Sequence, residues 1–97
     1  MKALRFSPLA RDDLLTIGAY IADDNPERAL SFVAELEAKA SEIAERPASF
    51  PARDELSPGL RSAVHGRYVL LFRDLEAEIR IVRILHGARN LQQILDE

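Results

Sequence analysis

The chain has 97 residues, the size of one small domain, and a content of 47% hydrophobic and 30% charged residues, which is typical of a globular protein. It has no cysteine, which excludes disulfides, thiolate metal sites and a cysteine nucleophile, and which fits a cytoplasmic protein. The net charge of −3 argues against a general nucleic-acid-binding protein, and we expect neither a signal peptide nor a membrane span, which needs roughly 18 apolar residues.

The N-terminal half predicts one short strand followed by two helices. Residues 2–6 alternate between polar and apolar side chains, as a strand does. Ser7-Pro8 and Asn25-Pro26 each place a capping residue before a proline, which is typical of helix N-termini. Apolar residues then recur at helical spacing, which predicts an antiparallel helix hairpin over about 8–24 and 26–46. The solvent side of the first helix should carry Arg11, Asp12, Asp13, Asp23 and Asp24.

The second half changes to strand patterns after a proline-rich loop at 47–59. Residues 60–65, 68–74 and 78–86 are rich in β-branched and other apolar side chains, and the short turns between them require antiparallel pairing. Residues 90–95 are expected to form one helical turn or a docking tail, and the whole tail, residues 88–97, is a candidate for part of the target-binding surface. The order of elements predicts a single α+β domain with an N-terminal strand, an antiparallel helix hairpin and a three-stranded antiparallel meander.

The last two strands carry apolar residues on both faces, although one layer of helices covers only one face. Simple alternation in the last strand places Val82 and Ile84 on one face. It places Ile79, Ile81 and Leu85 on the other. The uncovered set should bind a partner protein, unless the 47–59 loop and the C-terminal tail fold over it. The candidates for this partner surface are Tyr68, Leu70, Phe72, Val82 and Ile84.

Arginines gather in the C-terminal half of the chain. Residues 57–91 contain six arginines and three acidic residues, whereas residues 1–46 contain six basic and nine acidic residues. The C-terminal half can therefore present a positive surface to an anionic partner, the alternative being ordinary solvated strand edges. An arginine side chain binds phosphates and carboxylates through a bidentate fork. The candidates for target binding are Arg67, Arg83, His86 and Arg89, with Arg83 expected on the face opposite His86.

No complete catalytic or metal site follows from these residues. His65 and His86 each end a strand without an evident third ligand, so we expect no metal and no cofactor. Metal-independent RNA cleavage needs a stabilising cation, a base and an acid, and His86 can fill only one of the two proton-transfer roles. No tyrosine follows Tyr68, and the only lysines are Lys2 and Lys39. The pattern therefore favours an arginine-rich binding surface over a complete active site.

Three segments resemble the ParE-type toxins of the ParE/RelE superfamily. Residues 4–14, LRFSPLARDDL, are similar to the opening strand of these toxins and the A-xx-D-L pattern that follows it. Residues 66–73, GRYVLLFR, are similar to their central strand. Residues 81–90, IVRILHGARN, are similar to their closing V-R-I-L-H-G-A-R-D segment, with Asn90 in place of the aspartate. The order of elements also matches, so the resemblance covers nearly the whole chain.

The resemblance implies the toxin of a type II toxin–antitoxin pair, with DNA gyrase as its target. It also implies a ParD-like antitoxin, whose disordered C-terminal part folds over the toxin, and nucleic-acid binding only through that antitoxin. The RelE branch of ribosome-dependent mRNA endonucleases, which is similar in fold, is the first alternative. That branch needs basic residues and a C-terminal Tyr or His, for which Arg61, Arg67 and His86 are the nearest matches. An inactive or purely regulatory binding module is the second alternative.

Overall fold

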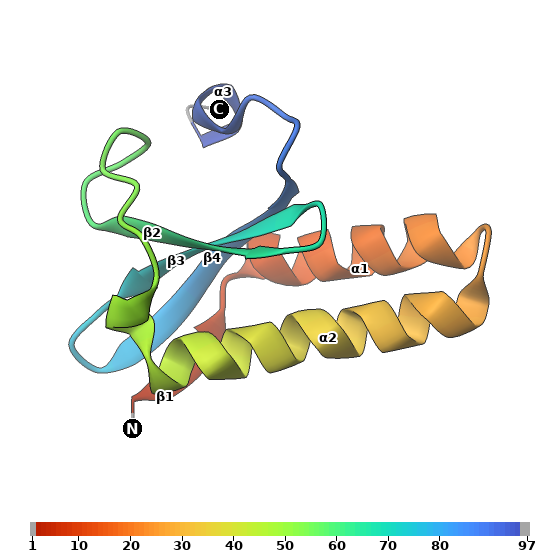
Figure 1. Cartoon of the computed structure of the whole chain (residues 1–97), viewed down its shortest axis with the longest axis horizontal. Helices are drawn as coiled ribbons and strands as arrows, with labels where there is room; N and C mark the ends of the chain where they lie inside the picture. Colours follow the sequence, from red (N-terminus) through yellow and green to blue (C-terminus); the bar gives the residue numbers. More distant parts are fainter. Residues whose placement is uncertain (1, 96–97) are drawn as a thin grey trace.

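In the computed structural model, which describes residues 2–95, a helix hairpin covers one face of a four-stranded sheet (Figure 1). The expected α+β fold is therefore confirmed. Among the described residues, no helix combines the length and the apolarity that a membrane span requires. The elements in chain order are β1 (Ala3–Phe6), α1 (Pro8–Ala22), α2 (Pro26–Glu45), the 3₁₀ turn η1 (Pro47–Ser49), β2 (Leu60–His65), β3 (Tyr68–Asp74), β4 (Glu78–His86) and α3 (Leu91–Leu95).

The strands lie in the order β1-β4-β3-β2. β2, β3 and β4 form the expected antiparallel meander. β1 adds to β4 in parallel, with Ala3 opposite Glu78 and Phe6 opposite Ile81. Parallel neighbours need a long crossover connection, and part of that connection here is the α1–α2 hairpin. The hairpin therefore lies across one face of the sheet.

Local sequence signals set where the two long helices begin. The Ser7 hydroxyl accepts a hydrogen bond from the N–H of Ala10, and the Asn25 side chain accepts one from the N–H of Arg28, each at 3.0 Å. A proline follows each cap at the first helical position, where its missing N–H is not needed. α1 ends at Ala22, two residues before the expected position, because the chain must already turn there into the second cap.

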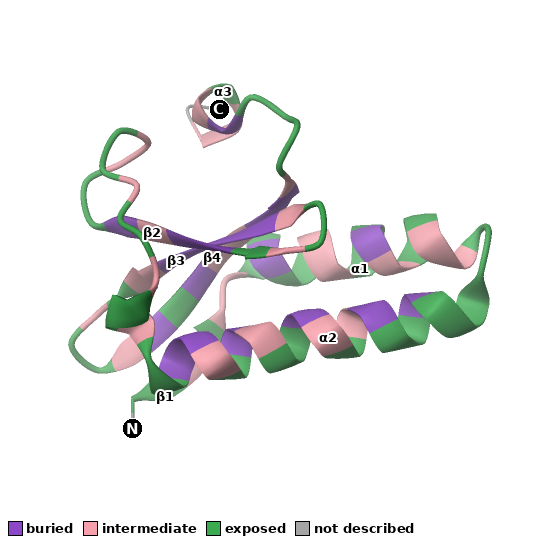
Figure 2. Cartoon of the chain, viewed as in Figure 1, coloured by how far each residue is buried: buried purple, intermediate pink, exposed green. Residues whose placement is uncertain are grey.

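The main core lies between the sheet and the helix hairpin, where buried residues of both layers meet (Figure 2). Burial of one large apolar side chain contributes about 1.5–3 kcal/mol, so this layer supplies most of the stability of the domain. Its largest fully buried members are Leu36, Ile43, Leu70, Phe72, Ile79, Ile81 and Ile84.

A β-bulge interrupts β4 in the middle of this sheet. Leu71 and Phe72 are adjacent in β3, but their partners in β4, Arg83 and Ile81, are two residues apart. Val82 is therefore an extra residue without a partner in the ladder. The alternation of side chains between the two faces shifts by one position beyond it.

The bulge overturns part of the expected partner surface. Ile84 faces the helices together with Leu70 and Phe72, and at most 2% of each residue is exposed. Assigning Ile84 to the opposite face was wrong, because simple alternation does not allow for an inserted residue. The helices cover these three side chains almost completely, so they offer almost no surface to a partner. Of the five candidates, Tyr68 and Val82 remain partly exposed.

The other face of the sheet is covered by the chain itself. Leu85, expected to face the helices, lies on this face with Leu60 and Leu71, because it follows the bulge. Leu56 of the loop and Leu91 of α3 pack against these residues, and α3 lies on the side of the sheet away from the hairpin (Figure 1). The loop and the tail therefore fold over this face, which is the alternative that the sequence left open. The prediction that this apolar face is left uncovered is wrong.

Candidate functional site

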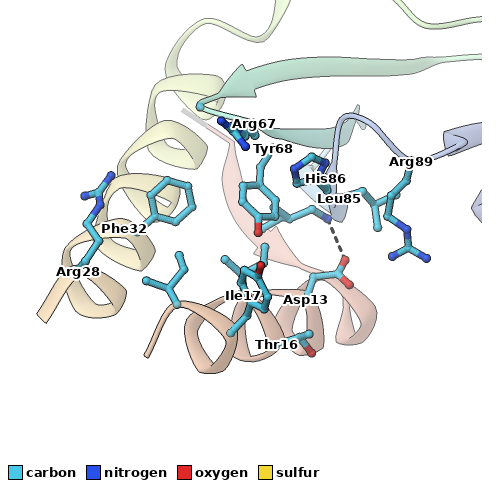
Figure 3. Close-up of a pocket in the computed structure, with 14 residues that line it drawn as sticks. Asp13, Thr16, Ile17, Arg28, Phe32, Arg67, Tyr68, Leu85, His86 and Arg89 are labelled. Carbon is cyan, nitrogen blue, oxygen red and sulfur yellow. Dashed lines mark hydrogen bonds between the residues drawn. The ribbon is translucent and has the colours of Figure 1, made fainter. Parts of the chain in front are cut away.

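A pocket of about 630 Å³ lies at the end of the sheet where β4 finishes and where β2 turns into β3. Strand residues and the tip of the turn form one side of it, and α1 and α2 form the other (Figure 3). The pairing of three strands places His65 opposite Tyr68 and Tyr68 opposite His86. The polar residues of the lining are Asp13, Thr16, Tyr20, Arg28, Arg67, Tyr68, His86 and Arg89, and the large apolar ones are Ile17, Ile21, Phe32, Ile84 and Leu85.

Two of the predicted target-binding arginines line this pocket with unpaired guanidinium groups. Arg67 and Arg89 are exposed, and neither side chain has a hydrogen bond or an ion pair with another residue of the described part of the chain. Arg67 lies at the β2–β3 turn, and Arg89 lies just after β4. Both guanidinium groups are therefore available to an anionic ligand.

A third arginine, Arg28, belongs to α2 and is already engaged. Its guanidinium lies 5.0 Å from the centre of the Phe32 ring and donates hydrogen bonds to the Glu35 carboxylate. His65 Nε2 lies 2.7 Å from the same carboxylate. The hydrogen bonds from Arg28, and next the one from His65, lower the pKa of Glu35. A hydrogen bond to Glu35 thus ties His65 to α2, and His65 is not part of the pocket lining.

Arg83, predicted to bind the target, is instead paired with Asp13 of α1. Its Nε and Nη2 atoms donate to the two carboxylate oxygens at 2.8 and 3.0 Å. The backbone N–H of Ile84 donates to the same carboxylate at 2.9 Å. Only 18% of the Arg83 side chain and 14% of the Asp13 side chain are exposed. This guanidinium therefore serves to join α1 to β4.

The end of β1 explains why Asp13 is not on the solvent side of its helix as expected. β1 pairs with β4 only as far as Ile81, so the following residues of β4 have no strand on that side. Ser7 replaces the missing strand at the first of these positions. Its N–H donates to the Ile81 carbonyl at 2.9 Å, and its hydroxyl donates to the Val82 carbonyl at 2.7 Å. Asp13 then provides the acceptor for the N–H of Ile84. Buried backbone groups at this edge are thereby satisfied.

His86 is held in one tautomer by the backbone that follows it. The N–H of Ala88 donates to His86 Nδ1 at 3.2 Å, so a neutral imidazole carries its proton on Nε2. The ring of Tyr68 packs edge-on against this imidazole, with 5.4 Å between the ring centres. Nε2–H can donate a hydrogen bond but cannot accept a proton. His86 is therefore oriented as a donor.

The residues nearest to a nuclease set are not brought together. Arg61 lies four positions before His65 on β2, about 13 Å along the strand. Its Nη1 donates to the Phe50 carbonyl at 2.6 Å. Only Arg67 and His86 of the three line the pocket. Within residues 2–95, no group of three or more metal-ligating side chains has a geometry suited to a metal ion.

Sequence reasoning missed the two tyrosines of the pocket. Tyr68 was assigned only an apolar contact, and Tyr20 was assigned no role, although 73% of it is exposed at the pocket. The adjacency of Tyr68 and His86 depends on the register between β3 and β4, which no local signal reveals. The strand-end position of His86 was the one available hint.

A second depression, of about 880 Å³, lies between α1 and α2 on the outer side of the hairpin. We call it the outer groove. Leu15 and Leu30 are 73% and 78% exposed there. Gly18 allows the helices to approach, since a Cβ atom at this position would lie 3.4 Å from the Val33 side chain. The lining residues are Arg11, Leu14, Leu15, Gly18, Ala19, Ala22, Pro26, Ala29, Leu30, Val33 and Glu37.

Comparison with known proteins assigns the family. The family model described as ParE toxin of type II toxin–antitoxin system, parDE, matches residues 4–91. Among solved structures, the chain is similar to the chromosomal ParDE system from P. aeruginosa, with a TM-score of 0.75 and 26% identity over 89% of this chain and 96% of that chain. It is also similar to the RelBE2 toxin–antitoxin complex from Mycobacterium tuberculosis, with a TM-score of 0.65 and 29% identity over 88% and 96% of the two chains. No curated protein sequence matches significantly. The chain therefore belongs to the ParE family of toxins of type II toxin–antitoxin systems.

Proposed function

We propose that this toxin inhibits growth by binding DNA gyrase through the pocket at the end of the sheet, and that a cognate ParD-like antitoxin neutralises it. Membership of the ParE family supports the choice of gyrase, because the ParE-type toxins that the chain resembles act on that enzyme. The observation that favours binding over RNA cleavage is the hydrogen-bonding character of the pocket. Arg67, Arg89 and His86 offer donors, and the one carboxylate in the lining, that of Asp13, is already occupied.

RNA cleavage through the 2′-hydroxyl needs a group that removes a proton. General acid and base groups each contribute roughly 10²–10⁴-fold to such a rate, so a pocket without a free base should cleave poorly. His86 can act as a base only after losing its hydrogen bond from Ala88. Binding of a protein surface needs no proton transfer, and the donors of this pocket are sufficient for it.

The alternative function is that of a RelE-like, ribosome-dependent mRNA endonuclease. Two observations favour it: the similarity to the RelBE2 complex, and the position of Tyr68 beside His86 in a pocket that also contains Arg67 and Arg89. In this mechanism the arginines stabilise the phosphate charge, and His86 or Tyr68 donates a proton to the leaving group.

The two functions are separated by assaying the purified toxin against gyrase supercoiling and, in parallel, against translating ribosomes with mapped mRNA ends. The Arg67→Gln, Arg89→Gln double variant should lose supercoiling inhibition. The Arg5→Gln, Arg46→Gln double variant, which removes two exposed arginines outside the pocket lining, serves as the charge-matched control. Codon-phased mRNA cuts that disappear in His86→Ala, with supercoiling unaffected, would establish the endonuclease instead.

The outer groove supports a location for the antitoxin that differs from the expected sheet surface. It is apolar, and it carries two highly exposed leucines, Leu15 and Leu30, which suit the apolar face of an amphipathic helix. Replacing either leucine by glutamate should weaken antitoxin binding without unfolding the toxin, because both side chains are already in water. Ala38→Glu adds the same charge at an exposed position of α2 outside the groove lining. Equal loss of affinity in this control would contradict the location.

A further inference from the structure

The pocket at the end of the sheet combines an apolar interior with unpaired cations. Ile17 of α1, Phe32 of α2 and Ile84 of β4 line it together with the rings of Tyr20 and Tyr68. The unpaired arginines, Arg67 and Arg89, come from the turn before β3 and the segment after β4 (Figure 3). A ligand that fills this space must offer both an apolar group and a negative charge.

No free carboxylate of the pocket lining competes with such a ligand for Arg67 and Arg89. Asp13 lies in the lining, but both of its oxygens accept hydrogen bonds from Arg83, and one also accepts the N–H of Ile84. Arg83 therefore neutralises this carboxylate. His86 adds a third donor, because the hydrogen bond from Ala88 keeps the proton of a neutral imidazole on Nε2.

The charge of the neighbouring helices limits how much negative charge the ligand can carry. Residues 8–45, the helix hairpin, contain three basic and nine acidic residues. Asp23, Asp24 and Glu27, at the tip of the hairpin, are exposed. A nucleic-acid strand carries one charge per phosphate, so it gains from the arginines but is repelled by the hairpin. A peptide with a single carboxylate also gains from the arginines, and the hairpin repels it less, because it carries only one negative charge.

From this arrangement we infer that the pocket binds a peptide segment of the target protein in which a glutamate or aspartate is next to a large apolar residue. The carboxylate of the segment binds one of the two unpaired arginines, Arg67 or Arg89, and its apolar neighbour packs against Ile17 and the rings of Tyr20 and Tyr68, which line the same pocket. The inference rests on the proposed function, since it describes the part of the target that the toxin contacts.

The test uses the full-length, ¹⁵N-labelled toxin and three small probes: N-acetyl-Phe-Glu-amide, the isosteric N-acetyl-Phe-Gln-amide, and uridine 5′-monophosphate. The glutamate probe should produce saturable shifts of the amide signals of Arg67, Tyr68 and Arg89. It should bind about fivefold more tightly than the glutamine probe, because only the carboxylate forms charge-assisted hydrogen bonds. The Arg67→Gln, Arg89→Gln variant should lose this preference, and the charge-matched Arg5→Gln, Arg46→Gln control should keep it.

Three outcomes would overturn the inference. The first is equal affinity for the glutamate and glutamine probes. The second is the absence of saturable shifts up to about 10 mM of the glutamate probe. The third is tighter binding of uridine 5′-monophosphate, which would identify a nucleotide site. Supercoiling inhibition measured on the same samples separates the two proposals, because the peptide preference can fail while gyrase is inhibited, and it can hold while gyrase is unaffected.

Discussion

Replacing Asp13 by alanine should destabilise the toxin more than any other single loss of a charge on its helices. The Asp13 carboxylate accepts two hydrogen bonds from Arg83 and one from the N–H of Ile84. Removing one partner of a fully buried ion pair costs about 3–5 kcal/mol, and a buried N–H left without an acceptor costs about 1–3 kcal/mol. Because 14% and 18% of the two side chains are exposed, water compensates for part of this loss. We expect a decrease of about 2–4 kcal/mol in the free energy of unfolding.

Two further variants separate the charge from the hydrogen bonds. Asp13→Asn keeps one acceptor oxygen for the N–H of Ile84 but loses the negative charge, so it should cost about 1–2 kcal/mol. Combining Asp13→Ala with Arg83→Ala removes both members of the pair. The double variant should then be more stable than the sum of the single effects predicts, by a coupling free energy of about 1–3 kcal/mol.

The assay is urea-induced unfolding followed by circular dichroism, with Asp12→Ala as the control. Asp12 is the neighbouring acidic residue of α1 and is exposed, so its removal should change stability by no more than about 0.5 kcal/mol. If Asp13→Ala is too unstable to study, Asp13→Asn and Arg83→Lys provide the same comparison. A change within about 0.5 kcal/mol for Asp13→Ala, or a coupling near zero, would refute the role of this pair in joining α1 to β4.

Three other predictions concern separate parts of the fold. Arg28, and next His65, lower the pKa of Glu35, so the stabilising effect of this carboxylate should be complete above the ordinary pKa of 4.5 and should be lost as the pH falls through the lowered pKa. The difference in Tm between the wild type and Glu35→Gln should therefore disappear on acidification. A difference that grows instead would contradict the ion pair between Arg28 and Glu35. Gly66→Ala should lower the free energy of unfolding by about 1–2 kcal/mol, because Gly66 has a φ of 58°, a left-handed conformation that is unfavourable for a residue with a Cβ atom. Thermal or urea unfolding measures this change, and an unchanged stability would show that the turn adapts. Leu91→Ala should lower the free energy of unfolding by about 2 kcal/mol and should increase the binding of an apolar dye, because α3 then covers the second face of the sheet less well. Unchanged dye binding would contradict this covering role.

The boundaries of the elements followed from local signals in the sequence. Ser7 and Asn25 cap the two long helices as expected, because a capping side chain and the proline after it act within one turn of the chain. The meander strands begin and end at the expected residues, 60–65, 68–74 and 78–86, because glycine, polar turns and runs of β-branched residues are also local features. The fold class followed from the order of these elements.

Which residues share a face or a pocket was decided by pairing between distant parts of the chain. One extra residue, Val82, reversed the faces of all later positions in β4 and placed Ile84 in the core. The register of β3 against β4 brought Tyr68 beside His86.

Because β1 ends early, the N–H of Ile84 has no strand partner and donates to the Asp13 carboxylate instead. Asp13, held at this position, also binds Arg83, so the Arg83 guanidinium is paired within the fold and is not exposed on the predicted target surface. The predicted tail, residues 88–97, extends to positions 96 and 97, which lie outside the described residues. Its described part, α3, covers the second face of the sheet, which the pattern of the strands left open to either a partner or the chain itself. A sequence pattern shows that a surface is apolar, but only the packing of the whole chain determines what covers it.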